Sequence, residues 1–171
     1  MKLSELQELV NVRRPAPPYG VRRLARVHSV EDLRRLAKRR IPAAAFNYIE
    51  GGGEDEVTMR RNRAAFDELE LVPRVLRDVS KIELTTTVLG EPFALPMVIA
   101  PIGSPRLFHH EGELASARAA AHCGIPFTLS SAGTQSIERI AAEAGGTLWY
   151  QLYVWSDRPL VEELLSRAKA S

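Results

Sequence analysis

Apolar residues recur at helical spacing early in the chain. Leu33, Leu36 and Ala37 repeat at the interval that places side chains on one face of a helix. Ser29 and Asp32 precede them with the spacing of a capping box, in which a hydroxyl and a carboxylate bind free N–H groups of the first turn. We therefore predict that a helix begins at Ser29.

A second helix is predicted in the segment PAAAFNYIEGG. Pro42 suits the first turn of a helix, where its missing N–H would have had no partner. The glycines at 51–53 are expected to end or bend this helix.

The hydrophobic period changes to two after Lys81. Apolar or β-branched residues alternate along KIELTTTVLG, and the turn residues Gly90, Glu91 and Pro92 then lead into FALP. Alternation followed by a turn predicts a short hairpin or edge strand in this part of the chain.

Three continuous apolar runs follow, and each is succeeded by a helical pattern. The runs are MVIAP, IPFTLSS and TLWYQLYV, and the helical segments are EGELASARAAAHCG, TQSIERIAAEAGG and DRPLVEELLSRAKAS. Strands that are apolar throughout are covered on their faces, and strand followed by helix is the order of a parallel β/α unit. We therefore predict an α/β fold with three such units.

Polar and small residues follow each predicted strand, where parallel β/α folds bind their ligands. They are Pro101, Ile102 and Gly103 after the first, Ser130, Ser131 and Ala132 after the second, and Gln151, Tyr153 and Trp155 at the third. Alternation would place the last three on one side of the strand, as a polar wall for a flat heteroaromatic ligand. Alternatively, Gln151 and Tyr153 satisfy each other inside a barrel, and spacing alone leaves both interpretations open.

Composition is that of an ordinary globular protein. The 171 residues are 45% apolar and 26% charged, and Cys123 is the one cysteine. No apolar run reaches the roughly 20 residues of a membrane span, and the first residues lack the pattern of a secretory signal. We therefore expect a cytoplasmic protein.

Positive charge is concentrated near the start of the chain. Residues 1–40 contain 11 Lys and Arg against 4 Asp and Glu, which leaves 12 against 17 in the rest of the chain. Residues 1–28 form a basic, proline-containing arm, for which peripheral contact with the inner face of the membrane stays open. No aromatic residues alternate with the basic residues at 34–40 to stack on bases, so we expect no nucleic-acid partner.

His109, His110, Glu111 and Glu113 raise the question of a metal site. They fall in the loop after the first predicted strand and at the start of the next helix, where acids favour the positive helix end. Adjacent histidines rarely bind one ion from a regular element, and no second ligand cluster accompanies them. We therefore predict no metal site and interpret this stretch as a loop that leads into a helix.

Several motifs together resemble one family, the FMN-dependent α-hydroxy acid oxidases and dehydrogenases. The motifs are FNYIEGGGEDEVTMRRNRAAFD, LTTTVLG, PMVIAPIG, HHEGELASARAAAHCG, TLSSAGTQSIE and YQLYVWSDR. The family includes glycolate oxidase, lactate oxidase, mandelate dehydrogenase and the flavin domain of flavocytochrome b2. The resemblance implies that residues 29–171 are the N-terminal portion of an FMN-binding (β/α)8 TIM barrel, with about three β/α units after N-terminal helices and a short hairpin.

The resemblance also implies which residues bind FMN. Pro101, Ile102 and Gly103 match the segment whose backbone lies against the flavin near its reactive N5 atom. Ser130 and Gln151 match polar groups that hold the flavin ring system. Ile102 departs from the Thr-Ala that family members often carry after the proline, although backbone contacts would survive this change.

Three further positions match residues that face the substrate, a small 2-hydroxy acid of the lactate or mandelate type. Tyr48 matches a tyrosine that binds the substrate carboxylate, and Tyr153 matches the active-site tyrosine beside the substrate hydroxyl. Ala132 stands where glycolate oxidase-like members carry a tryptophan, so the pocket would admit a larger side chain than that of glycolate. The electron acceptor, whether oxygen, a quinone or a cytochrome, is not assigned by these residues.

Other parts of the family's site have no counterpart in the sequence. The catalytic histidine, the carboxylate-binding arginines, the flavin-proximal lysine and the phosphate-binding loop all come later in the family, and none of the four histidines occupies the base's motif. We therefore expect a truncated or split enzyme, inactive and a poor FMN binder when purified alone, and a homo-oligomer in its full-length form. The competing hypothesis is a non-catalytic half-barrel module whose basic arm binds a membrane or partner.

Overall fold

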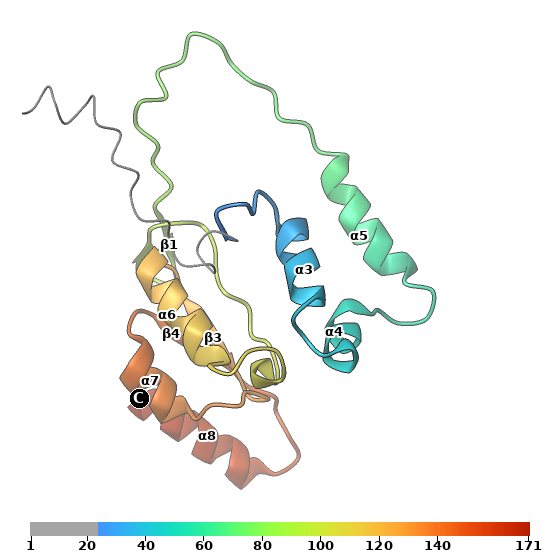
Figure 1. Cartoon of the computed structure of the whole chain (residues 1–171). Helices are drawn as coiled ribbons and strands as arrows, with labels where there is room; N and C mark the ends of the chain where they lie inside the picture. Colours follow the sequence, from blue (N-terminus) through green and yellow to red (C-terminus); the bar gives the residue numbers. More distant parts are fainter. Residues whose placement is uncertain (1–23) are drawn as a thin grey trace, which may run out of the picture. The chain divides into compact units, whose positions relative to one another are not determined.

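The computed structural model describes residues 24–171, which belong to two compact units (Figure 1). The first unit ends at Asn47, and the second is Tyr48–Ser171. Most of the predicted basic arm, up to residue 23, lies outside the described residues. No candidate membrane span occurs among the helices of the described part of the chain.

Helix α3, Val30–Lys38, begins where the capping residues predicted it. The Ser29 hydroxyl accepts a hydrogen bond from the Asp32 N–H at 3.2 Å. The Asp32 carboxylate accepts from the His28 N–H at 3.1 Å, one residue earlier than in a standard capping box. This bond from the His28 backbone lowers the pKa of Asp32 below its ordinary value.

Helix α4, Ala43–Glu50, follows Pro42 and stops before the glycines, as predicted. The Pro42 carbonyl accepts from the Phe46 N–H at 2.9 Å, which starts the helical hydrogen-bond pattern. The Phe46 side chain is buried, and the Lys38 ammonium lies 5.9 Å from its ring centroid. Phe46 therefore anchors α4 against the end of α3.

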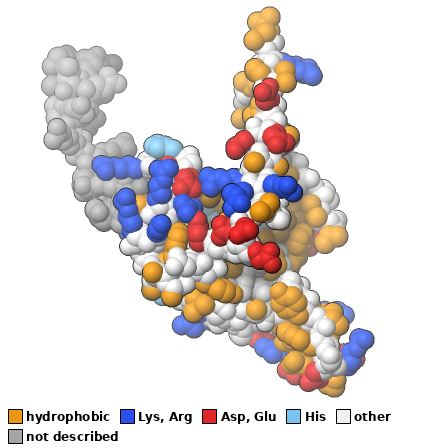
Figure 2. Space-filling view, turned by 90° about the vertical axis from the view of Figure 1, so that its right-hand side faces the viewer, with side chains coloured by type: hydrophobic (Ala, Val, Ile, Leu, Met, Phe, Trp, Pro, Cys, Tyr) orange, Lys and Arg blue, Asp and Glu red, His pale blue; other side chains and the backbone are white. Residues whose placement is uncertain are grey.

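The second unit contains a helix that the sequence analysis did not predict, α5, Val57–Asp67. An irregular stretch, residues 68–85, follows it and carries exposed apolar side chains. They belong to Leu69, Leu71, Val72, Val75, Leu76, Val79, Ile82 and Leu84. Figure 2 shows hydrophobic side chains on the surface between acidic and basic ones.

The predicted hairpin is shorter than the alternating sequence. Strands β1, Thr86–Val88, and β2, Glu91–Phe93, pair antiparallel, whereas residues 81–85 are not in a strand. The turn lies at Leu89 and Gly90, one residue before the predicted Gly90-Glu91-Pro92, and both have positive φ (54° and 88°). Positive φ at both positions matches the twist of a tight two-residue hairpin.

The parallel sheet contains β3, Phe127–Ser130, and β4, Leu148–Gln151, in a register that pairs Ser130 with Gln151. The first predicted strand, MVIAP, is reduced to one parallel bridge between Ile99 and Phe127. Proline has no N–H to donate to a sheet. Pro101 on one side and Pro126 on the other therefore limit how far this pairing extends.

The helices between and after the strands follow the prediction. They are α6, Glu113–Cys123, α7, Ile137–Ala144, and α8, Arg158–Ala170, after a 3-10 turn at Pro105–Leu107. Helix α6 ends at Gly124 with φ of 64°, a left-handed conformation that glycine adopts without strain. Helix α6 packs on β3 and α7, and α7 packs on α8 (Figure 1).

The core lies between α6, α7 and the sheet. Its buried members are Leu114, Ala117, Ala120, Ile125, Phe127, Leu129 and Ile140. Burial of a large aliphatic or aromatic side chain contributes about 1.5–3 kcal/mol. The core therefore fixes the two parallel strands, and with them the positions of their carboxyl ends.

Candidate active site

Ser130 and Gln151 join the ends of the two parallel strands. The buried Ser130 hydroxyl donates to Gln151 Oε1 at 3.1 Å and accepts from the Ala132 N–H at 3.1 Å. Because the Gln151 amide oxygen is used in this bond, its NH2 group is the part that can donate to a ligand. The side chain of Gln151 thus pairs with Ser130, not with Tyr153 as the barrel-interior alternative required.

A second set of hydrogen bonds joins the loop after β3 to the residues after β4. The Ser131 hydroxyl donates to the Gln151 carbonyl at 2.7 Å and accepts from the Tyr153 N–H at 3.0 Å. The Ser131 N–H donates to the same carbonyl at 3.0 Å. The backbone at Tyr153 is therefore positioned by Ser131.

The loop after the Ile99 bridge reaches the same edge of the sheet. The Ser104 N–H donates to the Ala132 carbonyl at 3.0 Å. A Cβ atom placed on Gly103 would lie 3.3 Å from the Ala132 Cβ. All three predicted strand ends thus meet at one edge, which we call the strand-end rim: Gly103, Ser130, Ser131, Ala132, Gln151 and Tyr153.

Three other predicted site residues, Pro101, Ile102 and Tyr48, are exposed. Pro101 is exposed and the Ile102 side chain is 58% exposed, so contacts between this segment and a flavin remain a prediction. Tyr48 lies on α4 with 75% of its side chain exposed, and its role also remains a prediction.

Tyr153 and Trp155 do not continue β4, because the strand ends at Gln151. The expectation that strand alternation aligns these three side chains is therefore wrong. The rings of Tyr153 and Trp155 nevertheless lie near each other, with centroids 6.1 Å apart and planes tilted by 59°. Tyr153 is 55% exposed, so its phenol is accessible from solvent.

Glu113, which the sequence predicted only as an acid at a helix start, contacts the loop that follows β3. Glu113 is 1% exposed and accepts hydrogen bonds from the Thr134 N–H and from the Thr134 hydroxyl, the latter at 2.7 Å. The sequence indicates an acid in the first turn of a helix. It does not indicate that Thr134, in the next β/α loop, is the hydrogen-bond partner of that acid.

The adjacent histidines lie on the surface of the loop before α6. Their ring centroids are 4.5 Å apart, and the Glu111 N–H donates to His109 Nδ1 at 3.4 Å. Within residues 24–171, no three His, Cys, Asp or Glu side chains form a group that could hold a metal ion.

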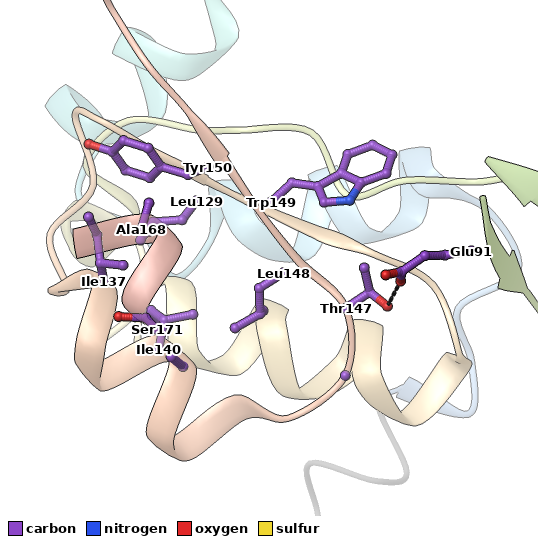
Figure 3. Close-up of a pocket in the computed structure, with 12 residues that line it drawn as sticks. Glu91, Leu129, Ile137, Ile140, Thr147, Leu148, Trp149, Tyr150, Ala168 and Ser171 are labelled. Carbon is purple, nitrogen blue, oxygen red and sulfur yellow. Dashed lines mark hydrogen bonds between the residues drawn. The ribbon is translucent and has the colours of Figure 1, made fainter. Parts of the chain in front are cut away.

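A cavity of about 400 Å³ lies beside β4 and the helices α7 and α8, away from the rim. Figure 3 shows Tyr150, Leu148 and Ile140 along this cavity, with Thr147 hydrogen-bonded to Glu91 at 3.1 Å. Of the rim residues, none lines it. Its wall combines polar and apolar groups of the sheet and the helices. We place the candidate site at the rim, where the predicted strand ends meet.

Comparison with known proteins identifies the family. Residues 37–171 match the sequence model of a family described as FMN-dependent dehydrogenase. The chain belongs to this family. FMN is the family's cofactor, so the membership and the cofactor inferred from the sequence motifs are confirmed.

Individual family members match along most of the chain. A putative L-lactate dehydrogenase of Mycobacterium tuberculosis is 45% identical over 171 residues, which are 99% of this chain and 41% of that protein. Glycolate oxidase 1 of Zea mays is 42% identical over 146 residues, which are 85% of this chain and 40% of that protein. The chain thus spans about two fifths of the length of these relatives.

Solved structures in the family agree with the fold. A soluble mutant of the membrane-associated (S)-mandelate dehydrogenase from Pseudomonas putida superposes with a TM-score of 0.79 at 41% identity, over 82% of this chain and 40% of that chain. A mandelate oxidase superposes with a TM-score of 0.78 at 39% identity, over 83% of this chain and 43% of that chain. These are TIM-barrel enzymes, and the α/β fold of this chain fits a part of such a barrel.

Proposed function

We propose that the chain takes part in the FMN-dependent oxidation of a small 2-hydroxy acid to the 2-oxo acid. The observation that carries the proposal is the strand-end rim, where polar groups from three consecutive strand ends converge in a member of an FMN-dependent family. Relatives named for lactate, glycolate and mandelate support the substrate class.

The donors at the rim suit the edge of an isoalloxazine ring. Its carbonyl and nitrogen atoms accept hydrogen bonds, and the Gln151 amide, fixed by Ser130, offers donors at the edge of the sheet. The backbone near Gly103 lies across the rim beside Ala132, where the flavin face would be contacted. When bound, FMN supplies the acceptor for the hydrogen that leaves the substrate α-carbon.

Substrate contacts are assigned to three side chains. Tyr153 would bind the substrate hydroxyl, Tyr48 would bind its carboxylate, and Ala132 would leave space for the substrate side chain. The Ser131 bond to the Tyr153 N–H supports the first assignment, because it sets where the tyrosine leaves the sheet. We assign the proton-accepting base to none of the residues described.

The test uses a fusion, because the chain spans about two fifths of its relatives' length. This chain is joined to the remaining C-terminal part of the Mycobacterium tuberculosis relative and assayed with lactate, glycolate and mandelate. We expect a yellow protein that reduces its flavin with a 2-hydroxy acid. Tyr153→Phe should lower kcat/KM by roughly tenfold to a hundredfold, the effect of one hydrogen bond to a developing charge.

Two results would contradict the proposal. One is a folded fusion that retains no FMN, and the other is a fusion that retains FMN but is not reduced by any 2-hydroxy acid. Trp155→Phe serves as the matched control, because it changes the aromatic neighbour of Tyr153 without removing a predicted substrate contact. Its kcat/KM should stay within about threefold of the parent fusion, in line with the small effects of most substitutions that remove no specific contact.

A further inference from the structure

Glu113 is a buried acid with a defined pair of partners. It lies in the first turn of α6 and is 1% exposed, and both of its carboxylate oxygens bind groups of Thr134 in the loop between β3 and α7. A carboxylate taken out of water is costly unless hydrogen bonds replace its hydration. Here the Thr134 N–H and hydroxyl supply such bonds, and the start of α6 favours a negative charge.

The backbone around the contact between Glu113 and Thr134 is too closely packed to accommodate an additional Cβ atom at Gly133. A Cβ atom on Gly133 would lie 2.8 Å from the Ser130 carbonyl oxygen and 3.2 Å from Glu113 Oε1. Gly112, directly before α6, has φ of 57°, a conformation that glycine adopts readily. Gly133 therefore allows the loop after β3 to approach Glu113 closely, and Gly112 supplies the backbone conformation from which α6 begins.

The contact fixes a turn that carries the rim. Within the turn of residues 131–134, the Gly133 N–H donates to the Ser130 carbonyl at 2.9 Å, and Ala132 bonds to Ser104. Thr134 closes this turn and is tied to α6 by Glu113. The turn that carries Ser131 and Ala132 is therefore bonded to a buried carboxylate through Thr134.

We propose that Glu113 is a positioning residue for the flavin and substrate site, a role that rests on the proposed function. Its carboxylate holds Thr134 and thereby sets where the 131–134 turn places Ala132 against Gly103 and Ser131 against Tyr153. Residues that do not touch a ligand can fix the positions of the residues that do, by packing against them and by hydrogen bonds, and binding requires these positions within narrow limits.

A neighbouring acid provides the matched control. Glu111 stands two residues earlier but is partly exposed, and it pairs with Arg118 at 3.4 Å across the surface. Exposed ion pairs of this kind contribute little to the free energy of unfolding. A second control, Ile140→Val, weakens the buried core of the same unit without touching the contact.

The experiment measures amide hydrogen exchange by NMR on the whole chain, and it measures FMN binding by flavin fluorescence on the fusion with the C-terminal part of the Mycobacterium tuberculosis relative. In Glu113→Ala, exchange at the Thr134 amide should rise roughly tenfold or more over that in Ile140→Val, and the Kd for FMN should rise by a similar factor. Glu113→Gln keeps an acceptor for the Thr134 N–H, so its Thr134 exchange rate and its Kd for FMN should be close to those of the unmutated protein. Glu111→Ala should change neither the exchange rate nor the Kd.

The outcomes separate the two proposals. Unchanged exchange at Thr134, or a rise that Ile140→Val reproduces, overturns the role of Glu113. Faster exchange with an unaltered Kd for FMN overturns it as well. If the unmutated fusion shows no saturable FMN binding, the result counts against the proposed function, and the exchange data alone then decide whether Glu113 fixes the turn. Thr134→Val, which loses only the hydroxyl bond, replaces Glu113→Ala should that variant fail to fold.

Discussion

The hydrogen bond between Ser130 and Gln151 allows a direct test of the strand-end rim. Ser130 is 6% exposed, and its one hydroxyl both donates to Gln151 Oε1 and accepts from the Ala132 N–H. Ser130→Ala removes both bonds and leaves both partners in place. The variant should therefore lose stability through unpaired polar groups and not through lost volume.

The expected magnitude follows from these contacts. A neutral hydrogen bond contributes about 0.5–1.5 kcal/mol net, and a buried group that loses its partner costs about 1–3 kcal/mol. Gln151 is half-buried and Ala132 is exposed, so water can reach both after the change. We expect the free energy of unfolding to fall by about 1–2 kcal/mol in Ser130→Ala. The coupling with Gln151→Leu in a double-mutant cycle should be about 0.5–1.5 kcal/mol, because replacing both partners removes the unpaired groups.

Urea unfolding of the parent, the two single variants and the double variant measures this coupling. Trp149 on β4 serves as the fluorescent reporter, since its ring lies 6.1 Å from that of Phe93 and should change environment when the sheet opens. A coupling below about 0.3 kcal/mol would mean that the two positions act independently, and it would refute the rim geometry. Ser116→Ala, at an exposed site on α6, should shift the unfolding free energy by less than about 0.5 kcal/mol.

Two further predictions concern acid stability and backbone packing. The hydrogen bond from Arg167 lowers the pKa of Glu138 from 4.5 to about 2 and links α8 to α7. The stability from this pair is present above pH 4.5 and is lost as the pH falls towards 2, so Glu138→Gln should flatten the acid limb of an unfolding-against-pH profile. If the free energy of unfolding falls equally steeply between pH 4.5 and 2 in the parent protein and in Glu138→Gln, this prediction is contradicted. Gly133→Ala should cost about 1–3 kcal/mol in urea unfolding through overpacking against the Ser130 carbonyl, whereas Gly53→Ala, with no atom within 4 Å of the added Cβ, should be near neutral; equal losses would refute the reasoning.

Local signals predicted several element boundaries. Ser29 starts α3 because its hydroxyl binds an otherwise unpaired N–H, and Gly124 ends α6 because it adopts a left-handed conformation. Both effects depend on a few neighbouring residues, so they can be recognised in the sequence. The apolar runs around Leu129 and Tyr150 likewise predicted the parallel strands β3 and β4.

Elements without a local signal were missed or misplaced. Helix α5 has no side-chain cap at Glu56 and buries none of its residues, so neither of the usual helix signals marks it. Ile82 and Leu84 alternate as strand residues do, yet they lack a partner strand and are exposed. Periodicity shows which conformation suits a segment, but pairing requires a partner whose position depends on the rest of the fold.

The sequence predicted which residues form the candidate site and that they lie at one edge of the sheet, but it did not predict the contacts between them. Parallel strands end at one edge of a sheet, which brought Gly103, Ser130 and Gln151 together in the analysis and in the structure. The contact between Glu113 and Thr134 spans 21 residues and two loops, and no periodicity reports it. The contact forms only because α6 packs against the loop after β3.

The connection between β3 and β4 bears on how the protein is made. Only α7 and its flanking loops separate the two strands, and the buried cluster around them runs from Leu114 to Ile140. Chains can fold in parts while they leave the ribosome, starting with the parts that are complete first. Every atom of the Ser130–Gln151 pair has been synthesised before α8 emerges. The hydrogen bonds at this edge of the sheet therefore need no residue of α8, and they can form as soon as residues 104–153 are free of the ribosome.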